Sequence, residues 1–189
     1  MSTLVAELLE LARLDRTSSL DLAETDLADV VRDAVADASA VEPERPVRAE
    51  APPRLVAVVD EPRIRQVLAN LLGNVRAHTP VTTPVAVRLS ELTGGVLLEV
   101  ADAGPGMPAE DAARAFDRFH RGPDRASGNG GGQNGRQGER EAANGAGSGL
   151  GLSIVQAIAH AHGGQATLES WPGRGTRVRI WLPTRTPVS

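Results

Sequence analysis

The chain has 189 residues, of which 41% are hydrophobic and 2% aromatic, so it is long enough for one well-buried domain with an aliphatic core. Its 20 basic and 24 acidic side chains give a net charge of −4, which argues against nucleic acid bound through a general basic field. The chain has no cysteine, which excludes disulfides, thiolate metal sites and a cysteine nucleophile.

The N-terminal half predicts three helices and one short strand. Leucines spaced by three and four residues predict a helix over residues 2–16. Asp26 is a candidate N-cap for a second helix, which ends before Pro43. A strand is expected at 55–59, after several prolines, and apolar residues at helical spacing predict a long helix over 62–78.

The C-terminal half predicts strands and two more helices. Alternating apolar residues favour a β-hairpin over 85–100, and a short helix beginning at Pro108 carries apolar residues as far as Phe119. A helix over about 150–158 is followed by two strands joined by a turn within 166–182. Helices combined with a mainly antiparallel sheet predict an α/β two-layer sandwich.

One internal stretch carries no signal for a packed core. From His120 to Gly149 there is no Val, Ile, Leu, Met, Phe or Trp, and Gly, Asn, Gln and charged residues dominate. A connection of this length inside a compact domain is either a functional lid or a disordered segment. Residues 122–146 are therefore expected to have no fixed fold.

Two glycine-rich segments are candidates for ligand contact. Asp102, Gly104 and Gly106 follow a predicted strand, where the carboxylate can accept a hydrogen bond from an amino group and the glycines admit close backbone approach. Gly149 and Gly151 precede a helix, whose N-terminal N–H groups and dipole favour phosphate. The alternatives are an ordinary turn for the first segment and a flexible loop before an ordinary helix for the second.

Asn70, Asn74 and His78 recur at four-residue intervals on the long predicted helix. This spacing places all three on one helical face, away from the leucines. The side-chain oxygen of Asn74 suits a hard cation such as magnesium, which is commonly shared with nucleotide phosphates. The alternative is a solvated helix face.

Taken in chain order, these motifs resemble the catalytic domain of histidine kinases, which are GHKL ATPases with the Bergerat fold. The resemblance extends from about Asp26 to Pro183, and residues 8–15 are similar to the end of the family's second dimerisation helix. The segments that resemble family motifs are 70–80 (asparagine box), 102–106 and 147–155 (first and second glycine boxes), 116–121 (phenylalanine box), and 162–164 with 173–176 (the usual ending). The expected organisation is a partial dimerisation helix over 1–17 and a catalytic ATP-binding domain over 18–189, with 122–146 as the ATP lid.

The resemblance implies a role for each matching residue. Asp102 would bind the adenine amino group, and Asn74 would hold Mg²⁺ between phosphate oxygens. The other implied ATP-binding residues are Asn70 and His78 on the phosphate side, Gly104 and Gly106 beside the purine, Gly149, Leu150 and Gly151 around the phosphates, Thr176 near the adenine, and Arg118 and Arg121, which would reach phosphate from a closed lid.

The chain departs from the family pattern at one position. The family commonly has Lys or Arg three residues after the magnesium-binding asparagine, where this chain has Ala77. Arg76 precedes it and is expected to face solvent, because it projects from another side of the helix. His78 or Arg121 is the candidate replacement for the missing cation.

The function implied is phosphoryl transfer from Mg-ATP to a histidine on a dimerisation helix. None of the chain's four histidines is followed by Glu or Asp, as the family's acceptor is, so no catalytic residue is assigned and the acceptor is expected to be absent from this chain. The implied partners are the kinase's own dimerisation and histidine-bearing helices and the receiver domain of a response regulator. The chain is expected to be soluble and to lie on the cytoplasmic side of a membrane-bound homodimer.

Two other functions use the same nucleotide pocket. Gyrase-like and chaperone-like ATP hydrolases have a water-activating glutamate one helical turn before the magnesium asparagine, where this chain has Asn70. A non-enzymatic module would bind nucleotide only as a switch.

Several other polar and aromatic residues have structural interpretations. His160 and His162 are expected to cap helix carbonyls or to face solvent. Asp60, Glu61 and Arg65 suit the start of the long helix, and Trp171 and Trp181 suit core or edge packing.

Overall fold

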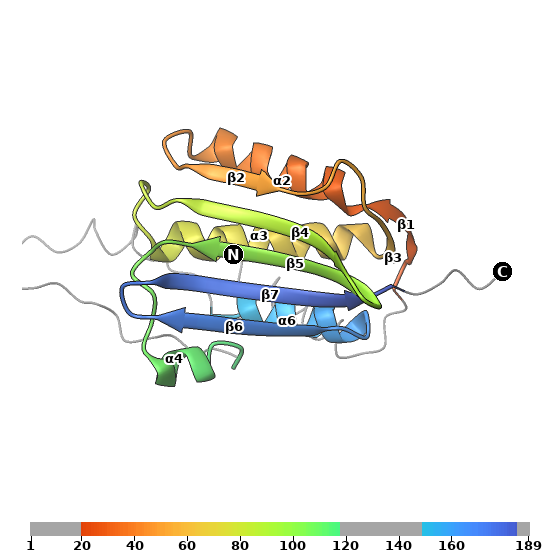
Figure 1. The fold of residues 1–189 in the computed structure, drawn as a ribbon. Helices are drawn as coiled ribbons and strands as arrows, with labels where there is room; N and C mark the ends of the chain where they lie inside the picture. Colours follow the sequence, from red (N-terminus) through yellow and green to blue (C-terminus); the bar gives the residue numbers. More distant parts are fainter. Residues whose placement is uncertain (1–19, 118–148, 185–189) are drawn as a thin grey trace, which may run out of the picture.

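The protein is a sheet covered on one face by helices. The computed structural model describes residues 20–117 and 149–184, so the helix expected over residues 2–16 and the segment 122–146 lie outside the described residues. Figure 1 shows helices α2 (Leu27–Val41), α3 (Glu61–His78) and α6 (Gly151–Ala161) behind the larger sheet. The predicted α/β two-layer sandwich is confirmed.

The larger sheet has five strands and is mainly antiparallel. Its order is β2-β4-β5-β7-β6, in which only the β2–β4 pair is parallel. The strands are β2 (Val47–Glu50), β4 (Val85–Leu92), β5 (Gly95–Asp102), β6 (Gln165–Trp171) and β7 (Gly175–Pro183). The predicted β4–β5 hairpin and β6–β7 pair are both present.

A second sheet of two strands was not predicted from the sequence. It pairs β1 (Ala23–Asp26) with β3 (Val56–Val59) in antiparallel register. The strand expected at 55–59 corresponds to β3, whereas β1 lies in a segment whose polar composition carries no strand signal. Strand β2 was also missed, because it lies between prolines.

Side-chain caps fix the starts of two helices that support the site. Asp26 caps α2 by accepting from the N–H of Ala28 at 3.0 Å, as expected, and also accepts from the N–H of Leu55 at 3.1 Å. Asp60 caps α3 by accepting from the N–H of Arg63 at 3.2 Å, with Pro62 in the first turn.

Helix α4 (Ala109–Ala113) is shorter than predicted and lies beyond the β6 edge. The sequence indicated a helix extending to Phe119, but the helical segment ends at Ala113 and turns follow it. None of its residues is buried, so α4 lacks the packing that would extend it.

The core is aliphatic and lies between the larger sheet and the helices. Strands β4, β5, β6 and β7 send alternate residues into it, as the two-residue period of a strand requires. Fully or nearly fully buried members include Leu27, Ile64, Leu68, Leu150, Ile154, Ile158, Ile180 and Leu182. At about 25 cal/mol per Å² of apolar surface, burial of each such side chain stabilises the fold by roughly 1.5–3 kcal/mol.

His162 joins the end of α6 to the start of α3. Its side chain is buried, Nδ1 lies 2.8 Å from the carbonyl oxygen of Ile158, and Nε2 accepts from the N–H of Asp60 at 3.1 Å. The expected carbonyl cap is confirmed, but His162 does not face solvent, whereas His160 is exposed. Because Nε2 accepts, the proton lies on Nδ1 and the ring is neutral.

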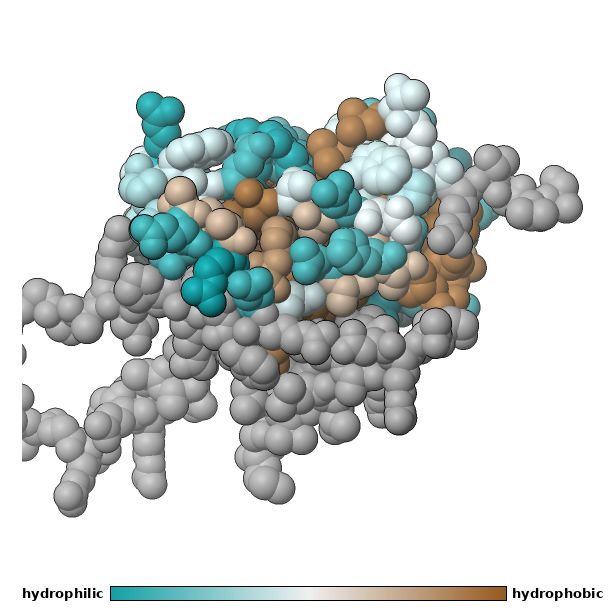
Figure 2. Space-filling model, turned by 90° about the horizontal axis from the view of Figure 1, so that it is seen from below, coloured by the Kyte–Doolittle hydropathy of each residue, from teal (hydrophilic) through white to brown (hydrophobic). Residues whose placement is uncertain are grey.

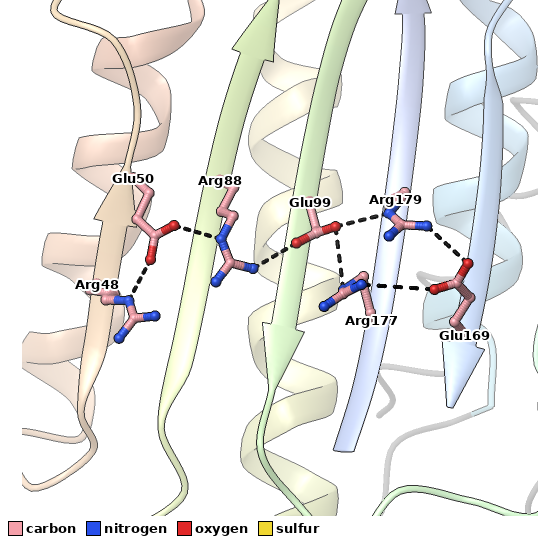
Figure 3. A network of polar contacts seen from close by, with 7 residues as sticks. All are labelled: Arg48, Glu50, Arg88, Glu99, Glu169, Arg177 and Arg179. Carbon is pink, nitrogen blue, oxygen red and sulfur yellow. Dashed lines mark hydrogen bonds and ion pairs between the residues drawn. The ribbon is translucent and has the colours of Figure 1, made fainter. Parts of the chain in front are cut away.

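The opposite face of the larger sheet carries charged side chains. Figure 3 shows them joined across the strands in the order Arg48, Glu50, Arg88, Glu99, Arg179 and Glu169, with Arg177 beside Glu99. We call these seven residues the charge ladder. Glu99 is the most buried residue of the charge ladder. It lies between two arginines because β5 pairs Glu99 with Arg88 of β4 on one side and with Arg179 of β7 on the other.

The surface at the β6 edge is mixed in character. Seen from this side, hydrophobic residues occur at several places between polar ones (Figure 2). Within residues 20–117 and 149–184, no helix is long and apolar enough to cross a membrane.

Candidate functional site

The asparagine face of α3 meets the start of α6. Asn70 and Asn74 are half-buried, and a Cβ atom placed on Gly151 would lie 3.4 Å from Oδ1 of Asn74 and 3.9 Å from Cβ of Asn70. Gly149, just before this helix, has a positive φ of 73°. The structure therefore brings together both asparagines and the glycine-rich helix start, which are about 80 residues apart in the sequence.

One polar atom in this cluster is buried without a partner. Nδ2 of Asn70 has no hydrogen-bond partner in the part of the chain that the structure describes. Leaving such a donor unsatisfied costs roughly 1–3 kcal/mol, so it is a position where a ligand oxygen would be stabilising. An amide donor and the N–H groups of a helix start together suit a phosphate.

Asp102 ends β5 beside a tight loop. It pairs with Thr176 of β7, and its Oδ1 accepts from the N–H of Gly104 at 2.8 Å. A Cβ atom on Gly104 would lie 2.6 Å from both Oδ1 of Asp102 and Cγ2 of Thr79, so only glycine fits there. Gly106 has a positive φ of 63° and sits against the backbone of Trp171.

The surroundings of Asp102 both raise and lower the pKa of its carboxyl group. Burial raises the pKa of its carboxyl group, while hydrogen bonds from the backbone of Gly104 and Thr176 and the charge of Arg45 lower it, with burial the largest effect. The net result is a carboxyl group whose pKa lies above its usual value. A ligand that brings a hydrogen-bond donor to Asp102 would favour the ionised form.

Arg45 belongs to this site, although no motif in the sequence indicates it. Its side chain is almost fully buried and donates to Oγ1 of Thr79 at 2.8 Å, to the carbonyl of Pro80 at 3.0 Å and to the carbonyl of Thr79 at 3.3 Å. Its Nε pairs with Glu42 at 2.5 Å. The contacts with Thr79 and Pro80 hold the segment after α3 against Gly104. They join residues about 35 positions apart along the chain, so the spacing of residues in the sequence cannot reveal them.

Helix α3 connects the two halves of the site. Asn74 touches the start of α6, and Thr79, five residues later, touches Gly104 beside Asp102. At 1.5 Å rise per residue these points are separated by about 7.5 Å along the helix. An adenine donor could thus meet Asp102 while the phosphates of the same nucleotide reach the asparagines.

Several other residues expected at the site are exposed, are buried in the core, or lie outside the described residues. His78 is exposed at the end of α3, and Arg76 and Ala77 are exposed beside it. Arg118 and Arg121 lie outside the described residues. Leu150 contributes only backbone, because its side chain is completely buried in the core. The replacement for the cation missing at Ala77 therefore stays a prediction.

Comparison with known proteins places these features in a family context. Residues 59–186 match the family model of histidine kinase-, DNA gyrase B- and HSP90-like ATPases. The probable sensor histidine kinase TcrY of Mycobacterium tuberculosis is 38% identical over 184 residues, which cover 97% of this chain and 35% of that protein. The chain thus spans about a third of the length of that relative.

Solved structures share the fold. ShkA, in complex with AMPPNP, matches 99% of this chain and 36% of its own chain with a TM-score of 0.75 and 26% identity. The ATP-binding domain of PrrB from Mycobacterium tuberculosis matches 88% of this chain and 99% of its own, with a TM-score of 0.65 and 24% identity. Arg45 lies outside the segment matched by the family model, whereas the asparagine face, Asp102 and Thr176 lie inside it.

Proposed function

We propose that this chain, which belongs to the family of histidine kinase-, DNA gyrase B- and HSP90-like ATPases, is the ATP-binding catalytic domain of a sensor histidine kinase. It would use Mg-ATP to phosphorylate a histidine on a dimerisation helix. Relatives named sensor histidine kinases, such as TcrY, support this assignment.

The observation that carries the proposal is the chemistry of the asparagine face. Position 70, one helical turn before Asn74, holds an amide whose Nδ2 is buried and has no hydrogen-bond partner among residues 20–117 and 149–184. An amide cannot take a proton from water as a general base, but it can donate a hydrogen bond to a phosphate oxygen. This favours transfer of the phosphoryl group to a positioned acceptor over hydrolysis of ATP.

Each side chain of the site would bind or orient one part of the nucleotide. Asp102 would accept a hydrogen bond from the adenine amino group, and the backbone at Gly104 would lie against the purine. Asn70 and the N–H groups at the start of α6 would hold the phosphates, and Asn74 would supply an oxygen ligand to magnesium. The magnesium would neutralise charge on the phosphates.

The protein's contribution to the reaction would be positioning. The unprotonated nitrogen of the acceptor imidazole would attack the γ-phosphorus in line with the departing ADP oxygen, so that an N–P bond forms as the P–O bond breaks. The proton on the other ring nitrogen would pass to the acidic residue that follows the acceptor histidine on its own helix. Because no group in the site needs to change protonation, catalysis would depend on holding the γ-phosphoryl group near the acceptor. The phosphoryl group would pass next to the receiver domain of a response regulator.

The cellular setting belongs to the same proposal. A sensor kinase of this type would be a membrane-anchored homodimer, with this domain on the cytoplasmic side next to its dimerisation helices. The length of TcrY beyond the matched segment leaves room for such parts in that relative.

A phosphotransfer assay tests the proposal. The chain is mixed with ATP, Mg²⁺ and a separately supplied pair of histidine-bearing dimerisation helices, and acid-labile phosphohistidine on the helices is measured. The proposal predicts transfer that is lost in an Asp102→Asn chain. Release of inorganic phosphate without transfer would assign a hydrolase, and binding without either reaction would assign a nucleotide-dependent switch.

A further inference from the structure

Ser170 joins three segments around the Asp102 loop. It lies on β6 and is buried, and its Oγ is within hydrogen-bond distance of three groups. The N–H of Met107 donates to it at 2.9 Å, the carbonyl of Gly175 lies 3.0 Å away, and Oγ1 of Thr176 lies 2.9 Å away. One hydroxyl therefore contacts the loop after Asp102, the backbone of the first residue of β7 and the side chain of Thr176.

The hydrogen-bonding capacity of a serine decides the direction of each bond. A serine hydroxyl has one proton to donate and can accept two hydrogen bonds. The N–H of Met107 can only donate and the carbonyl of Gly175 can only accept. When both are satisfied, Ser170 has only an acceptor position left for Thr176, so the hydroxyl of Thr176 donates to Ser170.

Strand register then places Thr176 next to Asp102. Asp102 pairs with Thr176 across β5 and β7, and Thr176 pairs with Ser170 across β7 and β6. The three side chains therefore share one face at the same end of the sheet. Because the proton of Thr176 is used by Ser170, Oγ1 of Thr176 has only lone pairs left for a ligand.

We infer that Ser170 is a positioning residue that sets base specificity, by turning Thr176 into a hydrogen-bond acceptor beside the acceptor Asp102. This inference rests on the proposed nucleotide pocket. With both acceptors directed at the substituent on position 6 of the purine, an amino group, which donates through two N–H bonds, is favoured, and an oxo group, which only accepts, is disfavoured. Ser170 itself does not touch the base in this assignment.

The same contacts hold the loop in place. Besides the bond to Met107, the N–H of Gly173 donates to the carbonyl of Pro105 at 2.7 Å, so the loop is tied to the β6–β7 turn at two points. Loss of the Ser170 hydroxyl removes one of these ties and frees Thr176 to rotate. The second tie allows the loop to stay near its place in a Ser170→Ala chain.

Titrations with two nucleotides test this inference. The unmodified chain, Ser170→Ala, Ser170→Thr and the control Thr167→Ala are titrated with ATP and with inosine triphosphate, whose purine has an oxo group at position 6. Thr167 lies on the same strand and is exposed. Ser170→Ala should lower the preference for ATP over inosine triphosphate roughly fivefold to tenfold, as expected for one neutral hydrogen bond.

The other variants separate specificity from stability. Ser170→Thr keeps the hydroxyl and should restore the preference, and Thr167→Ala should match the unmodified chain. In a Thr176→Val background, Ser170→Ala should have no further effect on the preference, because Ser170 acts through Thr176. If Ser170→Ala does not fold, Thr176→Val alone should show the lowered preference.

Two results would overturn the inference. One is an unchanged nucleotide preference in Ser170→Ala, or in Thr176→Val if only that variant folds. The other is an equal loss of affinity for both nucleotides, which would show that Ser170 only stabilises the loop. Failure of the unmodified chain to bind ATP would instead contradict the proposed function.

Discussion

Partial burial of the Asp102 carboxyl group raises its pKa and therefore costs the folded protein stability. Because its folded pKa is raised, the unfolded chain, with a pKa near 3.9, ionises first as the pH increases. The ionised carboxylate therefore costs stability above that pH, and the cost disappears as the pH falls back to about 4.

Replacement of Asp102 with Asn should separate binding from stability. We expect the ATP affinity of Asp102→Asn to fall, because the amide presents a donor to the adenine amino group, with a loss of roughly 1–3 kcal/mol. The unfolding free energy of the variant relative to the unmodified chain should increase between pH 4 and pH 7. Calorimetry and denaturant melts at several pH values measure both, and unchanged ATP affinity would contradict the role of Asp102.

Arg45 should matter far more for stability than its surface neighbours. Arg45→Met removes the donors to Thr79 and Pro80, which we expect to cost about 2–3 kcal/mol and to weaken ATP binding by loosening the contact with Gly104. Arg54→Met is a suitable control, since the Arg54 side chain is 79% exposed and its ion pair with Asp26 is 3.8 Å long. Urea melts that give the two variants the same loss would refute this role.

At the scale of the strands, the charge ladder depends on Glu99. Burial raises the pKa of Glu99, but hydrogen bonds from Arg179 and Arg88 outweigh it, so the pKa lies below its usual value. A lowered folded pKa means that the ionised Glu99 adds stability above its unfolded pKa. That contribution is lost as the pH falls through the folded pKa.

Glu99→Gln should therefore destabilise the protein in a pH-dependent way. We expect a loss of about 1–2 kcal/mol at pH 7, a modest value because the arginine partners are partly exposed and screened. The loss should shrink at high salt, and it should also shrink as the pH falls through the folded pKa of Glu99, which lies below its usual value. Glu91→Gln, at an exposed position on β4, should have little effect, and a Glu99→Gln loss that is the same at pH 3 and pH 7 would contradict the account.

The elements that could be predicted from the sequence are those with strong local signals. Apolar residues at helical spacing predicted α3, and apolar residues alternating with other residues predicted the β4–β5 hairpin. Asp26 predicted the start of α2. β1 and β2 were missed because each is held by pairing with a distant strand rather than by its own composition.

The residues of the site also divide into those with a local sequence signal and those that depend on distant partners. The asparagines and Asp102 could be found because their spacing forms motifs on single elements. The contacts of Arg45 with Thr79 and Pro80, the contacts of Ser170, and the link from His162 to Asp60 could not be found in this way. They join residues at least 34 positions apart along the chain or depend on the register between strands.

At the scale of the whole molecule, the arrangement of histidines predicts that the chain does not phosphorylate itself. Both ring nitrogens of His162 are engaged, with Ile158 and Asp60, and its side chain is buried. His160 lies nine residues, or roughly 13 Å, beyond the start of α6. His78 is fixed on the helix that carries Asn74, and His120, which lies outside the described residues, is followed by Arg121 rather than by an acidic residue.

Incubation with γ-labelled ATP and Mg²⁺ measures this directly. The chain alone should stay unlabelled, because transfer needs an acceptor nitrogen in line with the γ-phosphate at near-attack distance. Stoichiometric acid-labile label on the chain would place an acceptor within it and would contradict the assignment of that role to a separate helix.

Calorimetric titration of the chain with ATP, with and without Mg²⁺, tests the nucleotide site most directly. We predict saturable binding at one site, strengthened by Mg²⁺, with the strengthening lost in Asn74→Ala while binding itself largely remains. Absence of saturable ATP binding, or equal affinity with and without Mg²⁺ in the unmodified chain, would contradict it.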